Sequence, residues 1–143
     1  MTGVGDRIIR ASWAGTAVFT VVAVIATIDP ESLGAPAVLV SLVLFAAGSV
    51  AMFWAFLIAV QRSREVAIGI GGLYFGAGSA PKRVQRHLMA SLAVQVVVAV
   101  VTASIRVFTS LAFGILVPVW GLGLAGLWCA RHGEFAPRAD AGR

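Results

Sequence analysis

The side chains most able to do chemistry lie on one face of an apolar stretch, residues 87–105. Four polar residues in this stretch or directly after it share that face if the helix continues through them: Ser91, Gln95, Thr102 and Arg106. They fall within about 60° of arc, because each helical residue turns by about 100°. Such a face could form a polar pathway or a small-ligand site centred on Gln95. We favour the alternative that the hydroxyls and the amide join helices, each hydrogen bond contributing about 0.6 to 2 kcal/mol.

A second polar face lies in another apolar stretch, residues 11–28. Its four hydroxyl residues fall within about 80° of arc, and they are Ser12, Thr16, Thr20 and Thr27. Because hydroxyls and amides are unfavourable in hydrocarbon without a partner, we expect both polar faces to turn toward the interior of the protein.

Two Arg-His pairs indicate a different kind of site. Arg86-His87 begins one apolar stretch and Arg131-His132 follows the next. The connection at residues 106–110 is short, so the two stretches should form an antiparallel hairpin with both pairs at one end. Because Arg binds phosphate through paired donors, we predict that these four residues bind a lipid headgroup. Ordinary anchoring of basic side chains beside a membrane is the alternative.

Other chemistries lack the residues that they need. The apolar stretches hold no Asp, Glu or Lys for proton-coupled transport, and the single Cys129 cannot form an internal disulfide or redox pair. The two histidines do not have the spacing of haem or metal ligands. The glycine-rich segments 69–72 and 76–79 do not match a phosphate-binding loop. We therefore expect no cofactor, no metal and no enzymatic activity.

The composition indicates a membrane protein. The 143 residues are 59% hydrophobic and 12% charged, with a mean hydropathy of +0.95, whereas about a quarter of a soluble chain is charged. The net charge is +5. Most basic residues flank apolar stretches and few aromatic residues interleave with them, so the expected partner is anionic lipid and not nucleic acid.

Four apolar stretches are long enough to cross a bilayer as helices: residues 11–28, 35–60, 87–105 and 107–128. At about 1.5 Å per residue, each covers roughly the 30 Å of hydrocarbon. Backbone groups there must bond within their own segment, which favours helices. The predicted fold is an all-α, polytopic membrane protein, one domain with four transmembrane helices. Pro118 should kink the last helix by freeing the carbonyl of Gly114.

A ladder of alanines at four-residue intervals marks the second stretch: Ala47, Ala51, Ala55 and Ala59. Small residues let helices approach closely. We therefore predict a helix contact along this face, within the chain or with another copy or a larger membrane complex.

The basic residues are distributed unevenly about these spans. Ten of the eleven Lys and Arg residues lie before the first span, in residues 61–86 or in residues 131–143. The positive-inside rule then places both termini and the 61–86 loop in the cytoplasm. Residues 66–80 of this loop carry no charge and should form an interfacial or shallow re-entrant segment. Residues 131–143 are predicted to be a short mobile cytoplasmic tail.

Short stretches in the C-terminal half of the chain resemble a group of small actinobacterial membrane proteins. They are Gly78-Ser79-Ala80-Pro81, Val84, Arg86-His87-Leu88, residues 111–114 and residues 121–133. The resemblance implies a four-helix integral protein of the bacterial inner membrane. It implies no catalytic residue and no cofactor.

Without a catalytic constellation, we expect a structural or accessory membrane protein. It would pack with itself or with a larger membrane complex and contact anionic lipid. The alternative is a small oligomeric channel or transporter with a polar pathway around Gln95.

Overall fold

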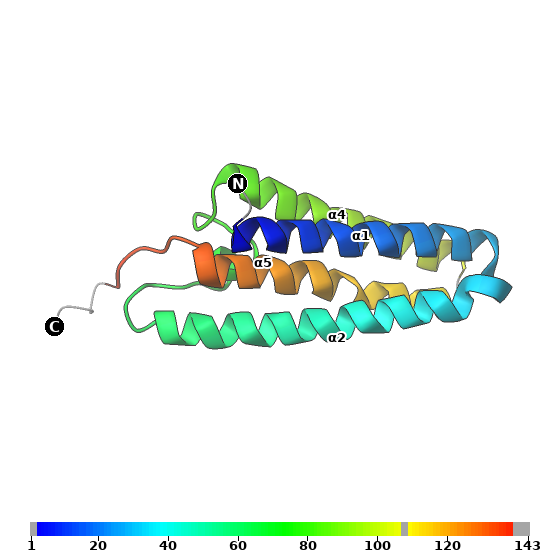
Figure 1. The fold of residues 1–143 in the computed structure, drawn as a ribbon, viewed down its shortest axis with the longest axis horizontal. Coiled ribbons are helices and arrows are strands. Elements are labelled where there is room, and N and C mark those ends of the chain that lie inside the picture. Colours follow the sequence, from blue (N-terminus) through cyan, green and yellow to red (C-terminus); the bar gives the residue numbers. More distant parts are fainter. Residues whose placement is uncertain (1–2, 107–108, 139–143) are drawn as a thin grey trace.

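The computed structural model describes residues 3–106 and 109–138, and all regular elements in those residues are helical. They are α1 (Val4–Ile28), α2 (Pro30–Arg62), α3 (Ile70–Tyr74), α4 (Lys82–Ile105), the 3-10 helix η1 (Ser110–Leu116) and α5 (Pro118–His132). Four segments are long and apolar enough to cross a membrane: Gly5–Ile28, Pro30–Arg62, Lys82–Ile105 and Leu111–His132. They lie along one another in an elongated bundle (Figure 1). The predicted all-helical class and the number of long apolar helices are confirmed.

The turn between α1 and α2 depends on Asp29 and Pro30. Asp29 ends α1 and precedes α2, and its carboxylate accepts a hydrogen bond from the Ser32 amide at 3.4 Å. Pro30 takes the first position of α2, where its missing amide leaves no helical bond unmade. The chain therefore reverses within a few residues, and α1 and α2 run antiparallel and in contact.

Polar residues extend the helices beyond the apolar stretches. Helix α1 begins at Val4, α4 begins at Lys82 and α5 continues to His132. The apolar pattern marks the length that hydrocarbon requires, whereas backbone hydrogen bonding continues into the polar flanks. Arg131 and His132, which we predicted to be in the tail, therefore belong to the last turn of α5.

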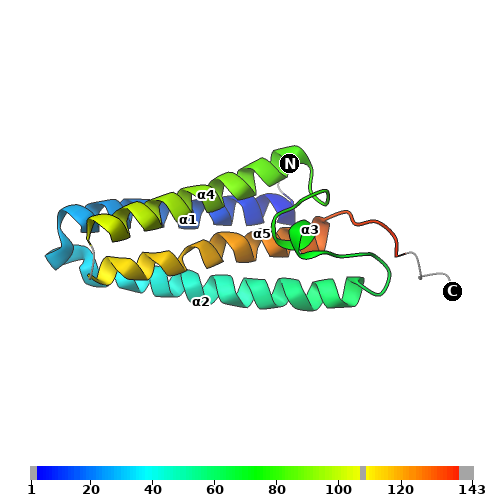
Figure 2. The same ribbon diagram turned by 180° about the vertical axis from the view of Figure 1, so that it is seen from behind.

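The final apolar segment is the most enclosed of the four. Half of the residues in its most apolar stretch are buried inside the bundle, against 22% to 33% for the other three segments. Helix α5 packs against α2, α1 and α4 (Figure 2). Its packing partners therefore surround it, and its small residues can matter on several sides.

The last predicted span is two elements and not one kinked α-helix. The 3-10 helix η1 ends at Leu116 and α5 starts with Pro118. The carbonyl of Gly114, which we expected to be free, accepts the Val117 amide at 3.0 Å. That bond has the i to i+3 spacing of a 3-10 helix, so the proline begins a new helix and the preceding turns tighten to meet it.

One end of the bundle holds the starts of α1 and α4 and the ends of α2 and α5, and we call it the basic end. Every described Lys and Arg except Arg106 lies in or next to these helix ends. The loop from α2 to α4 and both described ends of the chain are also there (Figure 1).

Within the predicted interfacial segment, residues 70–74 form the short helix α3, which packs against α5. Residue Leu73 of this helix is buried. The segment is therefore held on the bundle by its own side chains.

Residues 133–138 do not form the free tail that we expected. The Ala67 amide donates to the Ala136 carbonyl at 2.8 Å, and the Arg138 amide donates to Glu65 at 3.0 Å. The Glu134 amide donates to the Ser79 carbonyl at 2.8 Å. These backbone bonds satisfy polar groups of two otherwise irregular segments, which explains why the segments lie together.

Candidate functional site

The polar faces of α1 and α4 meet in the interior of the bundle. The hydroxyls of Ser12 and Ser91 lie 2.7 Å apart, and those of Thr16 and Ser91 lie 2.8 Å apart. All three residues are almost fully buried. The inward orientation of both faces thus follows from the cost of leaving hydroxyls without partners in an apolar environment.

Gln95 extends this cluster toward α5. Its side chain has no exposed surface. The amide nitrogen donates to Thr16 at 2.7 Å and to Ser91 at 3.3 Å, while the amide oxygen accepts the backbone N–H of Gly121 at 3.1 Å. We call Ser12, Thr16, Ser91, Gln95 and the Gly121 amide the polar network. It joins three helices.

The hydrogens of the polar network can be assigned from its geometry. The Thr16 hydroxyl donates to the Ser12 carbonyl at 2.8 Å, so the Ser91 hydroxyl must donate to Thr16. The Ser12 hydroxyl then donates to Ser91. Because the Gly121 N–H needs an acceptor, the Gln95 oxygen faces it and both amide hydrogens point at hydroxyls. Every polar hydrogen of the network therefore has an acceptor.

The break before α5 explains why Gln95 is needed. The carbonyl of Val117 would accept from Gly121 in a regular α-helix, but it accepts the Trp120 amide at 2.8 Å, as in a 3-10 turn. The Gly121 amide bonds to Gln95 instead. A side chain at Gly121 would not fit, because its Cβ would lie 2.7 Å from the Gln95 oxygen.

The other two residues of the predicted polar face are not part of the network. The Thr102 hydroxyl donates to the Val98 carbonyl of its own helix at 2.7 Å. Arg106 donates from Nε and a terminal nitrogen to the Thr27 carbonyl at 3.0 and 2.8 Å, which satisfies the end of α1. The polar face of α4 therefore has two parts: Ser91 and Gln95 belong to the polar network, and Thr102 and Arg106 bond to backbone carbonyls.

Two buried polar atoms have no hydrogen-bond partner among the described residues. They are the Thr20 hydroxyl and the indole nitrogen of Trp120. Thr20 lies one turn beyond Thr16 on α1, so the polar network stops at Thr16 and does not follow α1 farther from the basic end.

Helices α2 and α5 are joined in a different way. A Cβ at Gly123 would lie 2.2 Å from the Gly48 carbonyl oxygen, and a Cβ at Gly48 would lie 2.5 Å from the Cα of Trp120. Backbone touches backbone at this crossing, which only glycine permits. We call Gly48, Gly123, Ala55 and Gly126 the small-residue seam.

The predicted alanine ladder contributes only in part to the helix contacts. Ala55 and Ala59 are buried and Ala51 is half-buried, but Ala47 is exposed. Its neighbour Gly48 makes the close contact instead. A four-residue period drifts around a helix of 3.6 residues per turn, so the face that begins at Gly48 continues through Ala55.

The seam ends at α3. A Cβ at Gly126 would lie 2.5 Å from the ring of Tyr74, and the Tyr74 hydroxyl donates to the Met52 carbonyl at 3.3 Å. Burial raises the pKa of the Tyr74 phenol above its usual value. Tyr74 therefore covers the seam in its neutral form and fixes α3 against α2 and α5.

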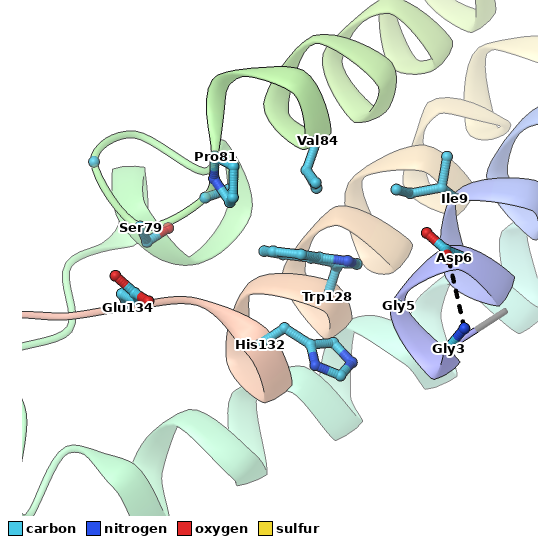
Figure 3. A pocket seen from close by; sticks show the side chains of 12 residues that line it. Gly3, Gly5, Asp6, Ile9, Ser79, Pro81, Val84, Trp128, His132 and Glu134 are labelled. Carbon is cyan, nitrogen blue, oxygen red and sulfur yellow. Dashed lines mark hydrogen bonds between the residues drawn. The ribbon is translucent and has the colours of Figure 1, made fainter. Parts of the chain in front are cut away.

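A hollow of about 550 Å³ opens at the basic end (Figure 3). The starts of α1 and α4, the end of α5 and the segment 78–81 line it. Figure 3 shows the indole of Trp128 in its middle, with Asp6 on one side and Glu134 on the other. Its described lining includes two carboxylates and His132, but no Lys or Arg. We call it the acidic hollow.

A second hollow of about 340 Å³ adjoins it between α1 and α4. Arg10, Arg83 and His87 line it. The two hollows share Asp6, Ile9 and Val84. We call the second one the basic hollow, and it lies beside the acidic hollow with a carboxylate between them.

The four residues of the predicted headgroup site do not meet in one place. All four are exposed. His87 lines the basic hollow and His132 lines the acidic hollow. Among the described residues, Arg86 and Arg131 line neither hollow. The short hairpin does bring both pairs to the basic end. It does not set the direction in which each side chain leaves its helix.

The residue Arg62 has a role that we did not predict from the sequence. Its terminal nitrogens donate to the carbonyls of Ala130 and Gly133 at 2.7 and 2.9 Å, and its guanidinium lies 5.2 Å from the ring centre of Phe135. It thus satisfies the end of α5, as Arg106 satisfies the end of α1. From the sequence, the position of Arg62 just after an apolar stretch indicated only an anchoring role beside the membrane.

No group of three metal-binding side chains occurs in the part of the chain that the structure describes. No protein-family model, curated protein or solved structure matches the chain. The features of the described residues that bear on function are the polar network, the seam and the hollows.

Proposed function

We propose that this protein is a structural or accessory integral membrane protein without a catalytic role. It packs through its outer surface with itself or with a larger membrane complex, and its basic end contacts anionic lipid of a bacterial inner membrane. The polar network carries the proposal, because the polar groups of Ser12, Thr16, Ser91 and Gln95 bond to one another and to Gly121, and none of them is left over for a substrate.

The contacts of Gln95 argue against the alternative of a channel or transporter. A permeating ion or solute would have to replace the bonds to Thr16, Ser91 and Gly121, and the last of these completes the start of α5. A buried group that loses its partner costs about 1 to 3 kcal/mol. A pathway through this point would therefore weaken the fold each time that it opened.

The outer surface of α2 supports a packing role. Phe53, Trp54, Phe56 and Leu57 are all more than half exposed. Large aromatic side chains supply much of the contact area in protein interfaces. In a membrane these side chains contact either lipid tails or a helix of another protein. Either contact is consistent with a protein that acts through its outer surface.

The direct test compares ion flux with partner recovery. Proteoliposomes with a potassium gradient and an entrapped pH dye should show no flux above empty liposomes, for wild type and for Gln95→Leu alike. Mild-detergent purification from the native membrane should recover the protein as an oligomer or with a stoichiometric partner. Gln61→Leu is the control, because Gln61 is exposed at the end of α2. Flux that Gln95→Leu abolishes and Gln61→Leu leaves unchanged would establish the channel instead.

The orientation can be tested separately. We expect both termini and the loop after α2 to be cytoplasmic, because the basic residues gather at that end. A cysteine at Ser32 should react with an impermeant reagent in intact cells, and a cysteine at Ser63 should not. The native Cys129 is buried and gives little background. The reverse labelling pattern would invert the topology.

A further inference from the structure

We infer that the two adjoining hollows at the basic end form one binding site for a phospholipid headgroup that carries an ammonium group beside its phosphate. The basic hollow takes the phosphate and the acidic hollow takes the ammonium. The inference rests on the proposed membrane insertion, and it adds to the contact with anionic lipid one defined site for a zwitterionic headgroup.

The basic hollow has the chemistry of a phosphate site. Arg10 comes from α1, while Arg83 and His87 lie one turn apart on α4. A guanidinium offers paired donors to a phosphate, and the bonds are strengthened by charge. Because two helices supply these groups, a phosphate in the hollow would be held from both sides.

The acidic hollow has the opposite character in a basic protein. The chain has eleven Lys and Arg and six acidic residues, yet the described lining of this hollow includes Asp6 and Glu134, with His132 as its one basic side chain and no Lys or Arg. Trp128 lies between these carboxylates (Figure 3). Carboxylates and the face of an indole both attract an organic cation.

The two hollows share part of their lining, so the sites for the two charges of the ligand adjoin each other. Asp6 lines both of them, together with Ile9 and Val84. A phosphate in the basic hollow would therefore have a carboxylate as its neighbour on one side. An anionic headgroup meets repulsion there, whereas an ammonium two carbons from the phosphate can donate to the carboxylate.

The place of the hollows favours a lipid as the source of this chemistry. They open beside the starts of α1 and α4, where these helices leave their apolar stretches, and the shared wall includes two aliphatic side chains. Soluble glycerophosphoethanolamine has the same charges but no acyl chains. The experiment must therefore separate the two sources.

Native mass spectrometry of the full-length protein tests the site with an equimolar mixture of phosphatidylethanolamine and phosphatidylglycerol. Wild type should retain phosphatidylethanolamine about two- to fivefold better, the range expected for a partly exposed ion pair. Asp6→Asn should abolish this preference and keep phosphatidylglycerol bound. Asn can still accept the bond that Asp6 receives from Gly3, and Asp6→Glu should restore the preference.

The matched cation variants separate a site from diffuse charge. Arg83→Gln should lower retention of both lipids by about two- to fivefold, whereas Arg86→Gln, with the same loss of charge outside the lining, should change it little. An excess of soluble glycerophosphoethanolamine should not displace the bound lipid. Equal losses for both Arg variants, a preference unaffected by Asp6→Asn, or displacement by the soluble compound would overturn the assignment. Each of these results leaves the flux and partner tests of the proposed function unaffected.

Discussion

The interface of α1 with α4 and the interface of α2 with α5 both hold two long helices together, but different interactions stabilise them. The first is held by side-chain hydrogen bonds between buried hydroxyls and one amide. The second depends on glycine, and backbone lies directly on backbone. In lipid, burying apolar surface does not favour one helix contact over another, so polar bonds and close packing are the two remaining means. The difference predicts that one interface tolerates added volume and the other does not.

The largest effect should come from adding a methyl group to the seam. Gly123→Ala places a Cβ 2.2 Å from the Gly48 carbonyl, so α2 and α5 must separate. We expect a loss of about 3 kcal/mol in the free energy of unfolding, measured by detergent denaturation. Gly69→Ala is the control, because no atom lies within 4 Å of a Cβ there. If Gly123→Ala leaves the stability unchanged, the backbones of α2 and α5 do not touch at this crossing.

The second effect concerns the bond that links the polar network to α5. Gln95→Leu keeps the volume but leaves the Gly121 amide and two hydroxyls with fewer partners. We expect a loss of about 2 to 3 kcal/mol in the free energy of unfolding, followed in the same titration. Gln61→Leu should be neutral, because Gln61 is exposed. Equal stability of the two variants would make the network dispensable.

A third comparison uses two residues of the alanine ladder. Ala55 has no exposed surface, so Ala55→Leu should overpack the seam at a cost of about 1 to 3 kcal/mol. Ala47→Leu adds the same atoms to an exposed position and should leave the unfolding curve unchanged. If Ala47→Leu instead reduces the oligomer size in detergent, this face contacts another copy.

A smaller effect distinguishes two hydroxyls of α1. Thr16→Val removes a hydroxyl that bonds to Ser91 and Gln95, which should cost about 1 kcal/mol. Thr20→Val removes a buried hydroxyl without a described partner, so it should be neutral or stabilising. Thermal unfolding followed by circular dichroism measures both variants under one condition. A reversed order would mean that the bonds of Thr16 contribute nothing net.

The smallest effect is a titration at the end of the seam. Burial raises the pKa of Tyr74, the only tyrosine of the chain, so the midpoint of its phenolate absorbance in the folded protein should lie at a higher pH than that of free tyrosine. Unfolded tyrosine ionises near pH 10. The unfolded state therefore loses its proton first, and stability falls as pH rises from the unfolded pKa toward the folded one. Tyr74→Phe removes the signal, and a midpoint at the value of free tyrosine would contradict the burial.

The sequence predicted most of the helices because apolar length and helical periodicity are local properties. The inward faces of α1 and α4 were predictable for the same reason, since Ser12, Thr16, Ser91 and Gln95 follow the helical period. The partners of these residues were not predictable. A bond between Gln95 and the Gly121 amide depends on where α5 starts, and a proline indicates a disturbance without saying whether a helix bends or ends.

The headgroup site predicted from the two Arg-His pairs shows a second limit of prediction from the sequence. The charges and the hairpin were visible in the sequence, and they correctly place both Arg-His pairs at one end of the bundle. Which cations share a hollow depends on the rotation of each helix about its axis. Arg83 and His87 face α1, where Arg10 lies, and this rotation follows from packing that no single segment encodes.

The start of α5 at Pro118 has a consequence for biosynthesis. The Gly121 amide finds its acceptor on α4, and α4 precedes α5 in the chain. A helix whose first turn bonds to another helix is costly to place in hydrocarbon alone, so the membrane insertion that we propose implies that α4 and α5 leave the translocon together as a hairpin. Gln95 is then already in place when the next segment arrives, and the order of synthesis matches the order in which the bonds are needed.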